Sequence, residues 1–353
     1  MQTTKSTATI KKSEPISLKW KQNLMRRFRL TNTLTVKLYN GYGYAQKLII
    51  FGHVLSLAPV ERKRFSNFFL INLFSLLRLF IVKPVSGAMV QLRWEGDIYK
   101  TTTNTDGYFT LEWESKRKLE FGWREIEVEL VTVNDKIITT GAGSIFIPHV
   151  TQYGFISDID DTFLISHSSN LRKRLFVLFT NNARSRKPFE GVVKHYQLLA
   201  KAQTNEDEPN PFFYVSSSEW NLYDYLVEFT AVNALPRGVF LLSQLKLFSE
   251  IIKTGQNKHA TKFARIVRLL ETFPTQKFIL LGDSSQHDAE IYTSIAEHFP
   301  GRIRAVYIRD VRKKNKQNVL HLLQKLEEAG ISCCLFEHSE EAINHSKNIG
   351  LIQ

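Results

Sequence analysis

Hydrophobic and polar residues alternate in short stretches along the first part of the chain. The segments TLTVKLYN and GWREIEVELVTV follow a two-residue period, and AQKLIIFGHVLSL and GSIFIPHV give two further strand candidates. The segment SGAMVQLRWEGDIYKTTTNTDGYFTLEWES indicates a strand, a turn at residues 104–107 and a second strand. Several short strands at this spacing predict a small antiparallel β-sandwich over residues 31–150.

From Phe155 onwards, apolar runs alternate with segments of helical length. The runs YGFISDID, PFFYVSSS, RGVFLL, QKFILLGD and IRAVYIRD are predicted strands. Apolar residues at helical spacing lie between them, at Leu222, Tyr225, Leu226 and Phe229 and again at Phe263, Ile266, Val267 and Leu270. This alternation predicts an α/β fold with a parallel sheet over residues 151–353.

Two segments stand outside this pattern. Residues 1–30 form a basic tail that ends in WKQNLMRRFRL, a short basic amphipathic helix that would bind a membrane surface or the protein body. Residues 62–83 form an apolar insertion between strands, and its core FFLINLFSLLRLFIV is shorter than the roughly 20 residues of a membrane-spanning helix. This pattern predicts a buried helix, or alternatively a helix lying in a membrane interface, where flanking RKR and Lys83 suit anionic head groups.

The charge of the chain indicates an anionic partner. The net charge is +13, and residues 1–30 carry eight Lys or Arg against one acidic residue, Glu14. Nucleic acid, a phosphorylated substrate and an anionic lipid surface all fit this balance. Nucleic acid is not expected, because the basic segments lack aromatic residues interleaved for base stacking.

Two adjacent cysteines, Cys333 and Cys334, exclude a disulfide framework and fit a reducing compartment. The N-terminus has no apolar core of a secretory signal. The expected location is cytoplasmic, with peripheral association at the membrane as a second expectation.

Polar residues with related chemistry follow three predicted strands. Asp158 and Asp160 follow FIS, serines 216–218 follow FFYV, and Asp283 and Asp288 follow FILLG. Ligands of parallel sheets bind at the carboxyl ends of the strands. Clustered carboxylates there predict a Mg²⁺ site, because the cation offsets their mutual repulsion.

The same residue types suit phosphoryl transfer. A serine hydroxyl and backbone N–H groups can hold phosphate oxygens, and a lysine can stabilise the transferred group. One aspartate can attack phosphorus while a second exchanges protons with the leaving group and with water. If the extended conformation continues past the strand, Asp158 and Asp160 point to the same side.

Four ordered motifs carry a specific resemblance. DIDDT, a strand ending in Ser, a Lys at a helix start and GDSSQHD resemble the four motifs of the haloacid dehalogenase superfamily of phosphohydrolases. With their flanks, ISDIDDT, FFYVSSSEWNLYDYL, GDSSQHDAEIY and FPGRIRAVYIRDV resemble the actin-patch phosphatidate phosphatase family, a Mg²⁺-dependent group of lipid phosphatases. The resemblance covers roughly residues 35–353 and implies a parallel-sheet catalytic domain of the haloacid dehalogenase type.

This resemblance implies a role for each matching residue. Asp158 would be the nucleophile and Asp160 the general acid and base. Mg²⁺ would bind Asp158, the backbone carbonyl of Asp160 and Asp283, with Asp288 binding it directly or through water. Ser216, with Ser217 beside it, would bind the phosphoryl group.

Lys262 would stabilise the phosphoryl group in the same scheme. The family usually has His-Lys at this place and this chain has Thr261-Lys262, which leaves Lys258 as the second candidate. Other departures, Glu219, Ser285 and Ala289, lie beside the chemistry and do not remove it.

The function implied by this resemblance is Mg²⁺-dependent hydrolysis of phosphatidate, or a related lipid phosphate, to diacylglycerol and phosphate through an aspartyl-phosphate. One alternative is a phosphatase of the same superfamily acting on a non-lipid phosphoester. A second is a non-catalytic, membrane-associated binding protein, for which substitutions of Asp158 or Asp283 would leave function intact.

Overall fold

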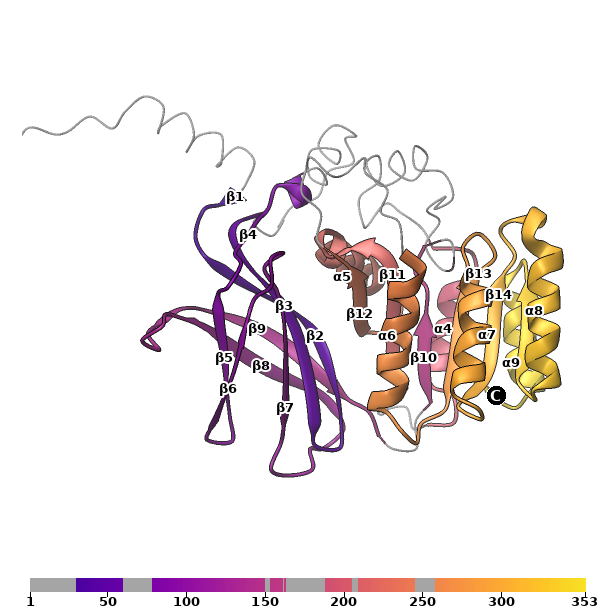
Figure 1. Ribbon diagram of the computed structural model, residues 1–353. Helices are drawn as coiled ribbons and strands as arrows, with labels where there is room; N and C mark the ends of the chain where they lie inside the picture. The colour runs from indigo at the N-terminus through magenta and orange to yellow at the C-terminus, as the bar shows by residue number, and fades with distance from the viewer. Residues whose placement is uncertain are drawn as a thin grey trace, which may run out of the picture.

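The chain forms two β-sheets that lie next to each other, as the computed structural model in Figure 1 shows. The structure describes residues 30–59, 78–149, 153–160, 162, 188–204, 209–244 and 258–353. The first sheet is built from the N-terminal part and the second, with its helices, from the C-terminal part.

The N-terminal sheet is a curled sheet of nine strands. Its strands are β1 (Leu30–Thr31), β2 (Thr35–Tyr44), β3 (Lys47–Pro59), β4 (Lys83–Pro84), β5 (Met89–Trp94), β6 (Asp97–Thr102), β7 (Tyr108–Glu114), β8 (Gly122–Val131) and β9 (Ile137–Ile147). The main order is β1-β3-β2-β9-β8-β5-β6, and β4 and β7 also pair with β3. All its strand pairs are antiparallel except β2 with β9.

Most strands of this sheet direct alternate side chains into a shared apolar core inside the curl. In β7 the buried residues are Phe109, Leu111 and Trp113, while every second residue is more exposed. These side chains pack with Val90, Val128 and others inside the curl. The two-residue period read from the sequence is therefore the period that this core uses.

The C-terminal sheet has six strands, all parallel, in the order β12-β11-β10-β13-β14-β15. The strands are β10 (Gly154–Ser157), β11 (Phe212–Glu219), β12 (Gly238–Ser243), β13 (Phe278–Asp283), β14 (Ile303–Arg309) and β15 (Ser332–Phe336). The winding reverses between β10 and β13, which are neighbours in space. A crevice at such a reversal is where parallel sheets bind their ligands.

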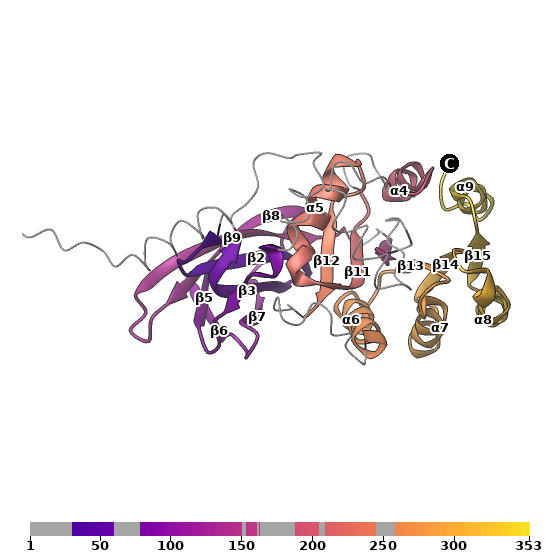
Figure 2. The ribbon, with the colours of Figure 1, turned by 90° about the horizontal axis from the view of Figure 1, so that it is seen from above.

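Helices cover both faces of this sheet, as Figure 2 shows. Helices α4 (Val192–Ala200) and α9 (Ser339–Asn348) lie on one face, and α6 (Lys258–Thr272), α7 (Asp288–His298) and α8 (Lys316–Glu328) lie on the other. The short helix η2 (Trp220–Leu222) and helix α5 (Tyr223–Val232) continue directly from β11. Cover on both faces explains why the strands read as continuous apolar runs in the sequence.

The two sheets pack through aromatic side chains. The ring of Tyr39 on β2 stacks on Trp220 of η2 with 4.1 Å between ring centroids. The hydroxyl of Tyr223 accepts a hydrogen bond of 2.9 Å from the backbone N–H of Asn40, and Lys37 pairs with Asp224. The curled sheet thus holds the segment that follows the serines of β11.

The structure confirms a mixed α/β class with a parallel C-terminal sheet. The sandwich arrangement and the domain limits stay predictions. Four strands were not predicted: β1, β4, β15 and one strand of the segment predicted as a single hairpin, which contains three strands and an additional turn at residues 95–96. No helix among the described residues is long and apolar enough to cross a membrane.

Two predictions concern segments that the structure does not describe in full. Residues 1–29 of the basic tail lie outside the described residues, and so does most of the apolar insertion at residues 62–83, while Leu30 begins strand β1. The last part of that insertion is described as η1 (Arg78–Phe80), and both end residues are buried. The carbonyl of Leu79 accepts a hydrogen bond of 2.9 Å from Asn221, so this end of the insertion packs against η2.

We predict that acid destabilises the junction between the sheets through His53. This side chain is fully buried, and its Nδ1 lies 2.8 Å from the hydroxyl of Tyr39. Burial, with the nearby charge of Lys37, lowers the pKa of His53 to about 3. Below about pH 6.5 the unfolded chain binds a proton that the folded chain does not, so the free energy of unfolding falls by about 2 kcal/mol between about pH 7 and about pH 5.

Urea unfolding of wild type and His53→Gln at these two pH values measures the contribution. The variant should lose about 2 kcal/mol less stability on acidification than the wild type. Equal losses in the two proteins would show that His53 does not carry the effect.

Candidate active site

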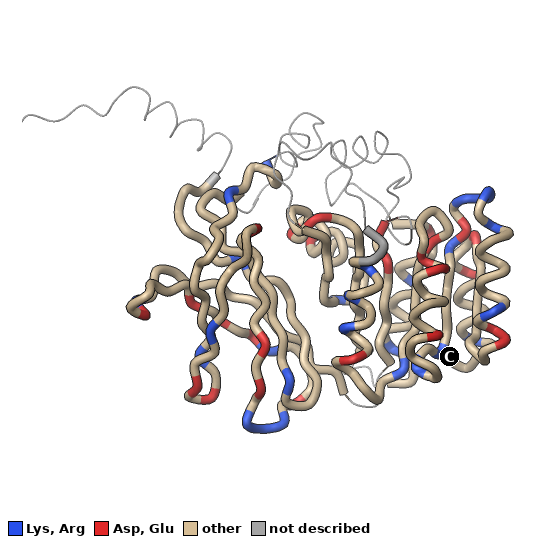
Figure 3. Tube along the Cα trace, in the orientation of Figure 1, with Lys and Arg blue, Asp and Glu red and all other residues tan. Residues whose placement is uncertain are grey.

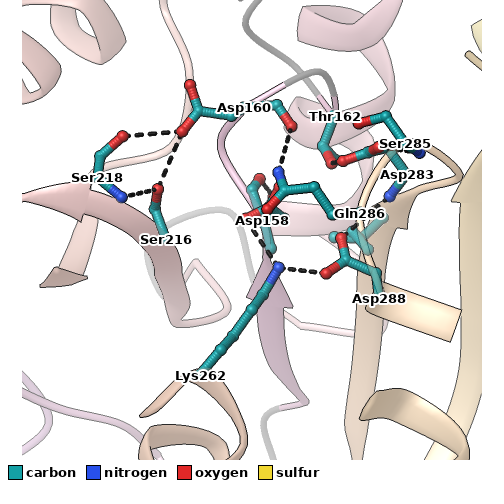
Figure 4. Close-up of polar contacts among 12 residues, drawn as sticks. Asp158, Asp160, Thr162, Ser216, Ser218, Lys262, Asp283, Ser285, Gln286 and Asp288 are labelled. Carbon is teal, nitrogen blue, oxygen red and sulfur yellow. Dashed lines mark hydrogen bonds and ion pairs between the residues drawn. The ribbon is translucent and has the colours of Figure 1, made fainter. Parts of the chain in front are cut away.

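The predicted site residues meet at the carboxyl ends of β10, β11 and β13, as Figure 4 shows. Asp158 follows β10 directly, Ser216 lies near the end of β11, and Asp283 ends β13. Each of these strands is an apolar run buried on both faces, so its first polar residues emerge at this edge of the sheet. The site lies where the winding of the sheet reverses.

Lys262 on α6 joins two of the carboxylates. Its Nζ lies 2.9 Å from Oδ1 of Asp158 and also pairs with Oδ1 of Asp288. Lys262 is 2% exposed and both carboxylates are fully buried, so water screens these ion pairs little. Lys258, the second candidate, is the first residue of α6, and its side chain lies outside the described residues.

A glycine lets Asp288 reach the end of β13. The backbone N–H of Asp283 donates a hydrogen bond of 3.1 Å to Oδ2 of Asp288. A Cβ at Gly282 would lie 2.5 Å from that same oxygen, so any larger residue would push the carboxylate away. Asp283 is held in turn by the N–H of Ser285, at 2.5 Å from its Oδ1.

Crowding and burial shift the proton affinities of this cluster. Burial raises the pKa of Asp158 well above its usual value, and the charges of Asp288, Asp283 and Asp160 add to this, while Lys262 opposes it. Burial and Asp288 raise the pKa of Asp283 to about 7. Burial alone would lower the pKa of Lys262, but Asp158 and Asp288 outweigh it and raise that pKa.

These residues fit a hard divalent cation. Asp158, Asp283 and Asp288 each offer one carboxylate oxygen, and the three atoms lie within 4.8 Å of one another. Carboxylate oxygens are the ligands that Mg²⁺ takes in proteins. Lys262 supplies a single positive charge against several buried carboxylates, so a divalent cation would offset the remaining repulsion.

Asp160 lies in a separate hydrogen-bond group beside this cluster. Its Oδ2 accepts hydrogen bonds from the hydroxyls of Ser216, at 3.2 Å, and Ser218, at 2.8 Å. Strand alternation was expected to point Asp158 and Asp160 to the same side if the strand continued, but β10 ends at Ser157. Their carboxylates instead have different partners, Lys262 for one and two serines for the other.

The sequence did not single out Ser218 and Gln286 as site residues. The hydroxyl of Ser218 donates a hydrogen bond to Asp160. Gln286 lies in the GDSSQHD motif, and its amide nitrogen lies 3.1 Å from Oδ2 of Asp158. Only their positions could have identified these two residues from the sequence, because both lie within three residues of a predicted site residue. Ser217, predicted to bind substrate, is the partly exposed member of the three serines.

Comparisons with known proteins find similarities for the C-terminal part of the chain. Residues 153–310 match the family model described as the catalytic domain of phosphatidate phosphatase APP1. Phosphatidate phosphatase APP1 of Saccharomyces cerevisiae is 35% identical over 165 residues, which cover 46% of this chain and 27% of that protein. The resemblance to the actin-patch phosphatidate phosphatase family is therefore confirmed over the matched residues.

Two further similarities are weaker. An uncharacterized protein of Schizosaccharomyces pombe is 22% identical over 262 residues, which cover 72% of this chain and 40% of that protein. The chain thus spans well under half the length of either relative. The structure of a carbohydrate acetylesterase from Xanthomonas citri aligns with 77% of this chain and 68% of its own chain at 10% identity. Its TM-score is 0.27, so the alignment gives no support for a shared fold.

Proposed function

We propose that this chain, whose residues 153–310 match the catalytic domain of the phosphatidate phosphatase family, is a Mg²⁺-dependent phosphatidate phosphatase. It would hydrolyse phosphatidate or a related lipid phosphate to diacylglycerol and phosphate. The observation that carries the proposal is the meeting of Asp158, Asp283, Asp288 and Lys262 at one point of the matched segment.

Strand order supports the assignment of the C-terminal part to the haloacid dehalogenase type. The central strand β10 carries the proposed nucleophile, and its neighbour β13 carries the acidic motif. We further propose that the curled N-terminal sheet, with its own apolar core, is a variant of the predicted sandwich.

The first step would be attack of an Asp158 carboxylate oxygen on phosphorus. A new bond forms between Asp158 and phosphorus, and the bond from phosphorus to the lipid oxygen breaks. Asp160 gives a proton to the departing lipid oxygen. The hydroxyls of Ser216 and Ser218 then donate to the carboxylate that this transfer leaves ionised.

The second step would hydrolyse the aspartyl-phosphate. The ionised Asp160 takes a proton from water, whose oxygen attacks phosphorus, and the bond to Asp158 breaks. Lys262 stays paired with Asp158 and keeps positive charge beside the reacting atoms.

Mg²⁺ would be held by Asp158, Asp283, Asp288 and the backbone carbonyl of Asp160, and when bound would supply positive charge for the phosphoryl oxygens. The bound cation would also stabilise the fold, because burial and then repulsion between carboxylates raise the pKa of Asp158 and Asp283, and the cation would offset that repulsion.

Basic residues at the same edge of the sheet support action at an anionic membrane surface. The helix η4 (Lys313–Asn315) and the start of α8 follow the carboxyl end of β14, and Figure 3 shows positive charge there. Lys313 and Lys314 belong to η4 and Lys316 begins α8. Such residues attract anionic lipid head groups near the site.

Phosphate release from phosphatidate vesicles tests the proposal. We expect release that depends on Mg²⁺ and stops in EDTA, and weaker cleavage of a nucleotide, a sugar phosphate and a phosphopeptide. Metal-independent release would overturn the proposed cofactor. Cleavage of a soluble phosphoester with none of any lipid would favour the non-lipid phosphatase. Binding to anionic vesicles without any phosphate release would favour the binding protein.

A further inference from the structure

The side-chain amide of Gln286 lies between two oxygens of the site. Its Nε2 is 3.1 Å from Oδ2 of Asp158 and 3.4 Å from the backbone carbonyl oxygen of Asp160. Figure 4 shows the amide between the chain of Asp158 to Asp160 and the loop that follows β13. None of the steps described above uses this residue.

The chemistry of the neighbours fixes which end of the amide faces them. A carbonyl oxygen only accepts hydrogen bonds, and so does an ionised carboxylate. The amide NH₂ group is a donor, whereas its oxygen would meet two acceptors and be repelled. Gln286 therefore presents Nε2 to Asp158 and to Asp160.

The carboxylate of Asp158 and the backbone carbonyl of Asp160 are also ligands in the proposed Mg²⁺ site. Mg²⁺ lies about 2.1 Å from its oxygen ligands, whereas an amide nitrogen needs about 2.9 Å. Each oxygen has two lone pairs, so the competition is one of space: the amide nitrogen contacts both oxygens at once, and a single ion that binds both needs the same place. We infer that Gln286 competes with the divalent cation for Asp158 and the carbonyl of Asp160, and so sets the cation affinity of the site.

Gln286 is the donor that can give way. Lys262 is charged, almost fully buried and paired with Oδ1 atoms of two carboxylates. Gln286 is neutral and partly exposed, and the next residue, His287, has a side chain that is 61% exposed. In this scheme Lys262 stays bound to Oδ1 of Asp158, whereas Oδ2 binds either Gln286 or the cation.

Through this competition the Gln286 amide lowers the affinity of the site for the divalent cation. The two hydrogen bonds stabilise the cation-free protein, and cation binding must break them. Removing the amide raises the free energy of the cation-free form only, which tightens binding. Since one of the bonds has a charged acceptor, we expect a gain in affinity on the order of tenfold.

Calorimetric titration with Mg²⁺ tests the inference without measuring catalysis. Gln286→Ala should bind the ion about tenfold more tightly than the wild type. Gln286→Glu, which removes the donor and adds a carboxylate, should also bind more tightly, and it serves if the alanine variant fails to fold. Gln324→Ala is the matched control, because Gln324 on α8 also donates to a carboxylate, Glu328, at 3.2 Å.

Thermal unfolding gives an independent measurement. In EDTA, Gln286→Ala should melt at a lower temperature than the wild type, and the gain on adding saturating Mg²⁺ should be larger. Gln324→Ala should show the wild-type gain. An affinity of Gln286→Ala that is equal to or weaker than that of the wild type would overturn the inference.

The inference rests on the cation of the proposed function, and the titration separates their failures. A wild-type protein that binds no Mg²⁺ would overturn both the proposed cofactor and the competition. A wild type that binds Mg²⁺, with Gln286 variants that bind no more tightly, would overturn the competition alone.

Discussion

Asp158→Asn should lower the rate of phosphate release by about 10⁴-fold or more, the scale seen when an enzyme loses its nucleophile. An amide oxygen is a poor nucleophile, and the change also removes one carboxylate of the proposed cation site. The side chain keeps its size, so the surrounding packing is preserved. Phosphate release from phosphatidate vesicles in Mg²⁺, with thermal unfolding as a check on folding, measures the effect.

Asp160→Asn is the matched control for this prediction. It leaves Asp158 able to attack but removes the proton donor, which costs about 10²–10⁴-fold. With p-nitrophenyl phosphate, whose leaving group needs no proton, the Asp160 variant should accumulate protein that carries one phosphoryl group. Intact-mass measurement after acid quenching should detect it there and not in Asp158→Asn. A phosphorylated or active Asp158→Asn protein would refute the nucleophile assignment.

Lys262→Met should affect both stability and rate. The ammonium group is buried between Asp158 and Asp288, so its removal leaves two carboxylates facing each other without a cation. Breaking a buried ion pair from one side costs about 3–5 kcal/mol. Loss of a positive charge beside the phosphoryl group should lower the rate by about 10²–10³-fold.

Urea unfolding in EDTA and in Mg²⁺ separates these effects. The loss of stability should be larger in EDTA, because a bound divalent cation offsets part of the repulsion. Lys258→Met is the control, and it should leave stability and rate near wild type. A larger loss of rate in Lys258→Met than in Lys262→Met would transfer the phosphate-stabilising role to Lys258.

Apolar runs and the polar residues that follow them were enough to predict where the site lies. Asp158, Ser216 and Asp283 each come after a strand whose side chains are buried on both faces, and parallel strands end at one edge. The helix that precedes β13 offered both Lys258 and Lys262, and the family resemblance favoured Lys262. These features depend on local order along the chain, which the sequence carries directly.

The orientation of the side chains could not be predicted in the same way. The strand ends before Asp158, so the direction of Asp160 depends on the loop and on Ser216 and Ser218, which lie 56 and 58 residues further along the chain. The contact of Gln286 with Asp158 spans 128 residues. Such contacts follow from tertiary packing, on which hydrophobic periodicity has no bearing.

Strand β15 shows a similar limit. Its sequence SCCLF is short and only Phe336 is buried, so no strong apolar run marks it. It forms because β14 offers a free edge along Ala305 to Arg309. Conversely, β2 has buried residues on both faces, since Val36 and Leu38 pack inside the curl while Tyr39 and Tyr42 face the other sheet.

The stacking of Tyr39 on Trp220 limits how this protein can be divided in the laboratory. A fragment beginning at residue 153 would contain the whole family match. It would lack Tyr39, which packs on Trp220 and Tyr223, and Tyr42, which packs on Phe213 and Phe273, so these four rings would lose their cover. Large exposed aromatic surfaces promote self-association. A truncated protein would therefore precipitate while keeping every proposed active-site residue, and fusion partners or affinity tags are best joined to a fragment that retains β2 and β3.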